Sequence, residues 1–173
     1  MSVSERSSER ALKEIRGLLE SGGTAGALYR VCCLLRERFS HYCWVGIYLL
    51  RGEELVLAAW DGKGATEHVR IPLGRGICGR AAREGRTVNV PDVRASAEYL
   101  ACFLETRSEI VVPILRGEEV LGEIDIDGDQ VDPYDASDEA FLSQVARLVS
   151  PHAAAVRAST AAPPVGPTVP GSS

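Results

Sequence analysis

The chain has 173 residues, of which 45% are apolar, and its formal net charge at pH 7 is −5. This length and apolar content suffice for one domain with one hydrophobic core. The acidic balance disfavours non-specific binding to nucleic acid and to anionic membrane surfaces, and every apolar run is too short to span a bilayer. We therefore expect a soluble single-domain protein with no nucleic-acid partner and no membrane partner.

The five cysteines are scattered along the chain, and the first ten residues lack the apolar run of an export signal. An odd number of cysteines without regular spacing does not form a disulfide framework. We therefore expect a cytoplasmic protein whose cysteines stay free unless they are catalytic or bind metal.

Two helices are expected first, followed by two β-hairpins. Apolar residues recur at helical spacing over residues 6–20 and again over about 24–39, and Gly22 and Gly23 separate the two segments. The hairpins cover residues 43–60 and 109–127, and each is built around an Arg-Gly-Glu-Glu turn. Because both connections are tight, the pattern predicts a mainly antiparallel sheet.

Shorter elements are expected between the hairpins, and one long helix after them. The sequence predicts a short helix over residues 77–84, a short strand over 87–90, and a helix from about residue 135 that Pro151 kinks or interrupts. From residue 160 onward the Pro-rich composition predicts a disordered tail. The expected organisation is an N-terminal extension over 1–23, a folded domain over 24–159 and a tail over 160–173.

The first strand carries two aromatic side chains on one face. Side chains alternate along a strand, so Trp44, Gly46 and Tyr48 point the same way. Two rings separated by a glycine leave a slot that suits a small apolar group or a cation. Ordinary core aromatics would show the same pattern, so both interpretations stay open.

The last strand of the second hairpin carries carboxylates on alternate positions. Glu123, Asp125 and Asp127 share one face, and Glu109 on the partner strand can add a fourth carboxylate. Carboxylates this close need a cation, a shared proton or full solvent exposure. An organic ammonium is favoured over a metal ion, because no histidine lies nearby and the calcium-loop spacing is missing. A solvated outer face is the alternative.

Two cysteines lie where chemistry is expected. Cys78 follows a glycine-rich turn at the start of a short helix, where the helix dipole is expected to lower the pKa of a thiol. Cys102 lies in an expected loop between two strands. Taken alone, a cysteine in such a position is more often a buried filler residue. We assign Cys32, Cys33 and Cys43 to the core.

Several motifs carry a resemblance to a known family. They are Trp-Val-Gly-Ile-Tyr at 44–48, Arg-Ile-Pro-Leu-Gly-Arg-Gly-Ile-Cys-Gly at 70–79, Ala-Cys at 101–102, Ser-Glu-Ile-Val-Val-Pro at 108–113 and Ile-Asp-Ile-Asp at 124–127. Their order resembles that of a GAF domain and, among GAF domains, of the free methionine-(R)-sulfoxide reductases. The resemblance implies an α+β fold in α/β/α layers. N- and C-terminal helices would cover one side of an antiparallel sheet of about six strands, with short helices and loops on the other.

The resemblance also implies a site and a reaction. The family's nucleophilic cysteine falls on Cys102 and a partner cysteine on Cys78. The implied substrate-binding residues are Trp44, Tyr48, Glu109, Asp125 and Asp127. The implied reaction is thiol-dependent reduction of free L-methionine (R)-S-oxide to methionine. An external dithiol such as thioredoxin would regenerate the enzyme, and neither a metal nor an organic cofactor is implied.

The chain departs from the family pattern in three places. His68 stands where the family has another cysteine, residues 97–100 read Ala-Glu-Tyr-Leu in place of Pro-Gly-His-Ile, and Phe103 replaces an acid. His68 is either a surface residue or a proton donor. Because these departures bring the loop nearer to many non-catalytic GAF domains, a GAF sensor is the alternative function, and a purely structural dimerisation module is a third. A homodimer is expected.

Overall fold

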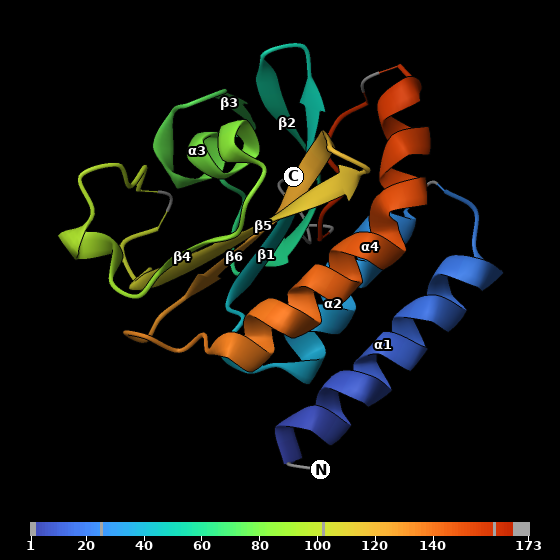
Figure 1. Ribbon diagram of the computed structural model, residues 1–173, viewed down its shortest axis with the longest axis horizontal. Helices are drawn as coiled ribbons and strands as arrows, with labels where there is room; N and C mark the ends of the chain where they lie inside the picture. Colours follow the sequence, from blue (N-terminus) through green and yellow to red (C-terminus); the bar gives the residue numbers. More distant parts are fainter. Residues whose placement is uncertain (1–2, 25, 102, 161, 168–173) are drawn as a thin grey trace, which may run out of the picture.

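A six-stranded sheet forms the centre of the protein (Figure 1). The computed structural model describes residues 3–24, 26–101, 103–160 and 162–167. Neighbouring strands pair antiparallel in the order β3-β2-β1-β6-β5-β4. The strands are β1 (Trp44–Arg51), β2 (Glu54–Gly62), β3 (Arg70–Pro72), β4 (Val88–Val90), β5 (Ser108–Arg116) and β6 (Glu119–Gly128). The two predicted hairpins are therefore confirmed as β1–β2 and β5–β6.

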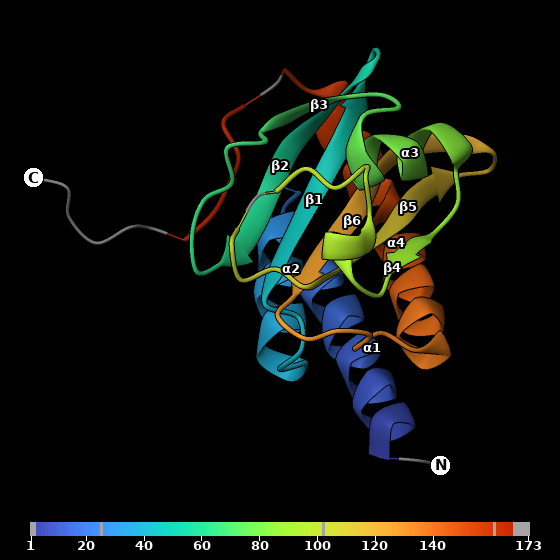
Figure 2. The same ribbon diagram turned by 90° about the vertical axis from the view of Figure 1, so that its left-hand side faces the viewer.

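Helices cover the two faces of the sheet unequally. The three longer helices, α1 (Val3–Ser21), α2 (Ala27–Arg38) and α4 (Ala136–Ala158), lie together on one face (Figures 1 and 2). The short helix α3 (Gly76–Glu84), the 3-10 turn η1 (Val93–Ala95) and the loops around them lie on the other. This is the expected α/β/α layering.

Alternation along β1 divides the apolar core into two clusters. Val45, Ile47 and Leu49 are buried against the three longer helices. Trp44 and Tyr48 point to the opposite face and pack in the cluster that contains α3. Because the sheet separates the two clusters, residues that contact α3 form a distinct layer, and the candidate site lies in this layer.

The helix α4 continues through Pro151 to Ala158 and is not interrupted there. Proline removes one intrahelical hydrogen bond. Val149 and Ala153 on either side are fully buried, so packing against the core holds the helix together across the proline. No helix in the described part of the chain combines the length and hydropathy that a bilayer crossing requires.

The expected disordered tail differs from the structure over residues 162–167. The Val165 N–H donates a hydrogen bond to the Ala58 carbonyl, and the Trp60 N–H donates one to the Val165 carbonyl, both at 2.9 Å. Val165 therefore forms a parallel bridge with β2 beside Ala59. A Pro-rich composition indicates disorder but does not reveal that one extended residue pairs with an open strand edge.

Candidate functional site

Four carboxylates gather on the sheet face that α3 covers. In the register of β5 and β6, Asp127 lies opposite Glu109, and Asp125 and Glu123 follow at alternate positions of β6. The exposed fraction of each residue is 6% for Glu109, 0% for Glu123 and 4% for both Asp125 and Asp127. The alternative of a solvated acidic face is therefore wrong.

This cluster lacks a compensating charge within the described part of the chain. No ion pair formed there includes any of the four carboxylates. Among the same residues, both carboxylate oxygens of Glu123 and the Oδ1 atom of Asp125 have no hydrogen-bond partner. A buried ionised carboxylate without a partner is costly, so the cluster favours bound protons or a bound cation.

Burial changes the protonation of all four groups. It is the largest cause that raises the pKa of Glu109, Glu123 and Asp127 well above the ordinary values, and repulsion from Asp125 adds to it. Burial also raises the pKa of Asp125 to about 7. At neutral pH the cluster therefore holds protons that an incoming cation would release.

A thiol lies among these acids. Cys78, in the first turn of α3, is buried, and its Sγ donates a hydrogen bond to Glu109 Oε1 over 3.7 Å. Burial, followed by the charges of Asp125, Glu123 and Glu109, raises the pKa of the Cys78 thiol well above its ordinary value. The expected lowering by the helix dipole is therefore wrong. A dipole contributes about half a charge, and desolvation together with three nearby carboxylates outweighs it.

Five of the predicted site residues surround one small cavity of about 10 Å³. They are Tyr48, Cys78, Glu109, Asp125 and Asp127. His68 and Leu100 also line it, together with Ile71, Gly76 and Ile77, and none of these was among the predicted binding residues. Leu100 packs over Gly76, where an added Cβ would lie 2.9 Å from the leucine side chain. A cavity of this size holds about one water molecule.

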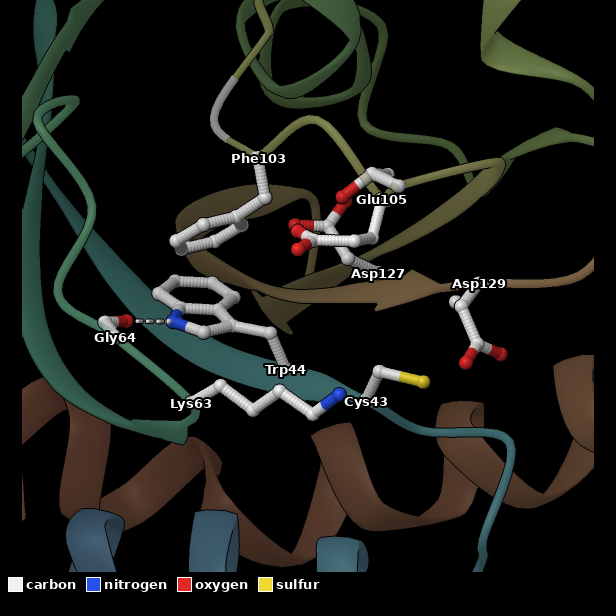
Figure 3. Close-up of a pocket in the computed structure, with 10 residues that line it drawn as sticks. Cys43, Trp44, Lys63, Gly64, Phe103, Glu105, Asp127 and Asp129 are labelled. Atoms are coloured by element: carbon white, nitrogen blue, oxygen red, sulfur yellow. Dashed lines mark hydrogen bonds between the residues drawn. The ribbon is translucent and has the colours of Figure 1, made fainter.

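Trp44 lies beside a second cavity, of about 60 Å³ (Figure 3). The Trp44 indole N–H donates to the Gly64 carbonyl at 3.1 Å, and the Phe103 ring lies over the indole with 6.2 Å between ring centroids. An added Cβ at Gly46 would lie 2.3 Å from the Trp44 ring, so the indole itself fills the expected slot between Trp44 and Tyr48. Asp127 borders both cavities.

Cys102, the predicted nucleophile, lies outside the described residues. Its described neighbours reach both cavities, because Leu100 lines the first and Phe103 the second. The His68 Nε2–H donates to the Ala101 carbonyl at 3.3 Å. Tyr48 in turn donates its hydroxyl to the His68 carbonyl at 2.9 Å. His68 thus joins the acidic cavity to the segment that carries Cys102.

The remaining cysteines differ from one another in burial. Cys32 is fully buried in the helix-side core, as expected. Cys33 and Cys43 are half-buried, and Cys43 lines the second cavity, so assigning both to the core is wrong. A pattern of apolar neighbours predicts burial poorly at an element's end, where Cys43 precedes β1.

Comparison with known proteins identifies the family. The model of the GAF domain matches residues 24–152. The chain belongs to the GAF domain family. The "GAF domain-containing protein A" of Dictyostelium discoideum is 38% identical over 147 residues, which cover 84% of this chain and 91% of that protein. The expected fold class is therefore confirmed.

Among GAF proteins the expected resemblance to the reductases is also confirmed. The free methionine-R-sulfoxide reductase of Escherichia coli is 36% identical over 118 residues, which cover 68% of this chain and 70% of that protein. The structure of the free methionine-R-sulfoxide reductase of Neisseria meningitidis, solved in complex with its substrate, superposes with a TM-score of 0.81 at 33% identity. That match covers 91% of this chain and 95% of the other.

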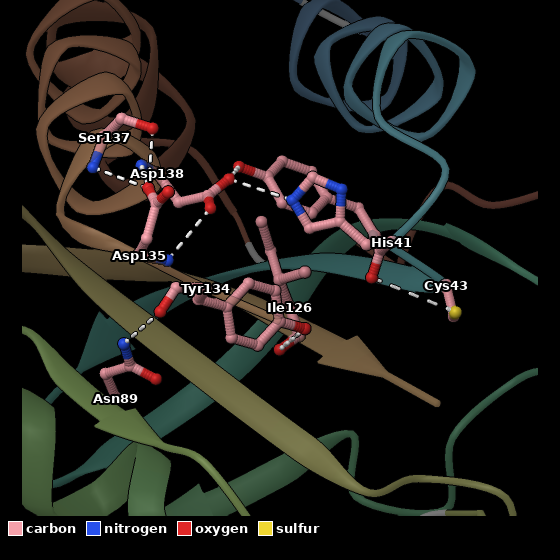
Figure 4. Close-up of polar contacts among 9 residues, drawn as sticks. His41, Cys43, Asn89, Ile126, Tyr134, Asp135, Ser137 and Asp138 are labelled. Atoms are coloured by element: carbon pink, nitrogen blue, oxygen red, sulfur yellow. Dashed lines mark hydrogen bonds and ion pairs between the residues drawn. The ribbon is translucent and has the colours of Figure 1, made fainter. Parts of the chain in front are cut away.

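Polar contacts fix the acidic strand of this GAF domain from the side of α4 (Figure 4). The Tyr134 hydroxyl donates to the carbonyl of Ile126, which stands between Asp125 and Asp127. The Tyr134 carbonyl accepts a hydrogen bond from Asn89 at 3.2 Å. Asp135 then caps α4 by accepting from the Ser137 N–H at 2.7 Å. These contacts join β6, β4 and α4 behind the carboxylates.

Proposed function

We propose that this chain is a free methionine-R-sulfoxide reductase, an oxidoreductase that acts on a sulfur group. The observation that carries the proposal is the buried cluster of uncompensated carboxylates around the Cys78 thiol, next to a cavity walled by aromatic rings. The relatives named free methionine-R-sulfoxide reductase support the assignment.

In this proposal the acidic cavity selects a free amino acid. Glu109, Asp125 and Asp127 would bind the ammonium group of L-methionine (R)-S-oxide, which supplies the positive charge that the cluster lacks. A peptide-bound methionine sulfoxide has no such ammonium, so it would leave these carboxylates uncompensated. Trp44 and Tyr48 would pack against the S-methyl end. Since the two cavities are small, Leu100 and Phe103 would move as the substrate enters.

The proposed chemistry needs one thiolate and one acid. The Cys102 thiolate attacks the sulfoxide sulfur, and a protonated carboxyl of Glu109 or Asp125 gives its proton to the sulfoxide oxygen. The substrate sulfur gains two electrons and leaves as methionine, while Cys102 becomes a sulfenic acid. Asp125, whose pKa is raised to about 7, retains a proton to donate at neutral pH.

Regeneration completes the proposed cycle. The Cys78 sulfur attacks the Cys102 sulfenic acid, a Cys78–Cys102 disulfide forms, and the oxygen leaves as water. An external dithiol such as thioredoxin then reduces the disulfide. The cycle requires neither a metal nor an organic cofactor, and a cytoplasmic homodimer stays part of the prediction.

One observation favours a second candidate, a non-catalytic GAF sensor. The pKa of the Cys78 thiol is raised by its acidic, buried surroundings, and a protonated thiol is a slow nucleophile. His68 also stands where the reductases have a further cysteine, so Cys78 alone would have to resolve the sulfenic acid. A sensor would bind a small cation in the same cavity without turnover.

The two candidates separate in a coupled assay. Free L-methionine (R)-S-oxide is incubated with the protein, thioredoxin, thioredoxin reductase and NADPH, and NADPH consumption is followed. We expect turnover by the unmodified chain and by Cys33→Ser, a matched cysteine control on the helix side of the sheet. Cys102→Ser should abolish turnover, and N-acetyl-methionine sulfoxide should be a poor substrate. Turnover that persists in Cys102→Ser rejects Cys102 as the nucleophile, and no turnover above the blank by the unmodified chain rejects the reductase.

A further inference from the structure

Three side chains of the acidic cavity present ligand atoms to a common point. One atom each from Cys78, Glu109 and Asp125 lies within 4.8 Å of the other two, and all three residues are buried. Cys78 Sγ and Glu109 Oε1 lie 3.7 Å apart. The three atoms come from α3, β5 and β6, so the fold itself brings them together.

These separations fit a tetrahedral zinc ion. With Zn–S of about 2.3 Å and Zn–O of about 2.0 Å, two ligands at a tetrahedral angle lie about 3.5 Å apart. The sulfur–oxygen contact of 3.7 Å is close to that value, and the other separations, which are at most 4.8 Å, need to shrink by about 1.5 Å at most. The cavity of about 10 Å³ suits a single small ion better than a larger group.

Unsatisfied oxygens nearby give an independent indication of a missing ligand. Asp125 Oδ1 has no hydrogen-bond partner among the described residues, although Asp125 is only 4% exposed and lines the cavity. Glu123, the next residue on the same face of β6, is fully buried with both carboxylate oxygens unpartnered in the same part of the chain. Polar atoms in this state are rare in folded proteins unless an ion or a ligand contacts them.

We propose that Cys78, Glu109 and Asp125 form a binding site for Zn²⁺. On binding, the Cys78 thiol and any protonated carboxyl release their protons to solvent, and a zinc–sulfur bond forms without electron transfer. The thiolate ligand selects Zn²⁺ over Mg²⁺ and Ca²⁺, which prefer oxygen alone.

The consequence for activity rests on the proposed function. The same carboxylates would bind the substrate ammonium, and the same thiol would resolve the sulfenic acid. Zn²⁺ is therefore a competing ligand and not a cofactor. It excludes the substrate from the acidic cavity and removes Cys78 from the thiol–disulfide cycle.

The metal site is tested by binding, without any turnover. Chelator-treated full-length protein is titrated with Co²⁺, whose bond to a thiolate gives a near-ultraviolet charge-transfer band, and Zn²⁺ stoichiometry is measured by equilibrium dialysis. We expect one ion per chain and a charge-transfer band that Zn²⁺ abolishes. Cys78→Ser should lose the band, and Asp125→Asn should weaken Zn²⁺ binding at least about tenfold. Cys33→Ser should behave as the unmodified chain.

Three results would overturn the site. They are a band that persists in Cys78→Ser, a stoichiometry below one ion per chain at excess Zn²⁺, and Mg²⁺ that binds as tightly as Zn²⁺. Circular dichroism checks that each variant is folded. Cys78→Ala, which leaves no hydroxyl in the acidic cavity, serves if Cys78→Ser does not fold.

Competition separates the two proposals. If free methionine sulfoxide raises the apparent Kd for Co²⁺ and Zn²⁺ inhibits turnover, both stand. Co²⁺ bound through Cys78 in a protein without turnover supports the metal site and rejects the reductase. Turnover with no Co²⁺ band supports the reductase and rejects the metal site.

Discussion

Replacing Asp125 by asparagine should stabilise the ligand-free protein at neutral pH. Asparagine has nearly the same shape as aspartate but does not ionise, so the variant avoids burying a charge without a partner. The expected gain follows from the pKa of Asp125, which burial raises from 3.8 to about 7.

The sign and the size of the effect follow from linkage. Because the pKa of Asp125 is higher in the folded state, its contribution to stability is complete below about pH 4 and is lost as the pH rises to about 7. A shift of about 3 units corresponds to about 4 kcal/mol at 1.36 kcal/mol per unit. Glu109 and Asp127 can hold the shared proton instead, which reduces the effect. We therefore expect the free energy of unfolding of Asp125→Asn, relative to that of the unmodified chain, to increase by about 2 to 4 kcal/mol as the pH rises from 4 to 8.

Urea unfolding of the two proteins, in buffers from pH 4 to pH 8 that contain a chelator, measures this difference. Glu118→Gln is the matched control, because Glu118 is an exposed carboxylate in the turn between β5 and β6. The free energies of unfolding of the unmodified chain and of Glu118→Gln should fall in parallel as the pH rises, while that of Asp125→Asn falls less. Equal slopes in all three proteins would refute the reasoning about the uncompensated cluster.

Other changes test the packing and the loop contacts. Gly122→Ala should lower the free energy of unfolding by about 3 kcal/mol, because the added Cβ would lie 2.0 Å from the Tyr48 carbonyl oxygen. Gly17→Ala, in α1 with no atom within 4 Å of the added Cβ, should raise it by about 1 kcal/mol. Both changes in the free energy of unfolding are obtained from urea midpoints. A Gly122→Ala variant as stable as the unmodified chain would show that β1 and β6 separate easily. His68→Ala should lower kcat/KM about tenfold by freeing the Ala101 carbonyl. His68→Gln, which can still donate, should restore most of it, and equal losses in the two variants would contradict a positioning role.

The sequence predicts the acidic face of β6 well but not its environment. Alternation assigns Asp125 and Asp127 to one face irrespective of the rest of the fold. Their burial depends on α3 and on the loop with Leu100, which come from distant parts of the chain. The low exposure of these acids, and hence their raised pKa values, could not be predicted from local spacing.

The rotamer of Trp44 and the charges around Cys78 are two further features that the sequence pattern does not predict. Alternation places Trp44 and Tyr48 on the same face, but the rotamer of Trp44 turns its indole across Gly46 and toward a separate cavity. The α3 dipole suggested an acidic thiol at Cys78, whereas the three carboxylates opposite it reverse that effect.

The hydrogen bonds of Val165 have a consequence for how the molecule behaves among its own copies. β3 pairs with Glu54 to Val56 of β2, and the Leu57 N–H donates to the Val69 carbonyl, so the outer edge of β2 that β3 leaves uncovered begins beyond Leu57. Val165 occupies that edge beside Ala59 and satisfies the two backbone groups that face outward on either side. A strand edge left open is a template for intermolecular pairing. By pairing there, Val165 removes this part of the β2 edge from such a template.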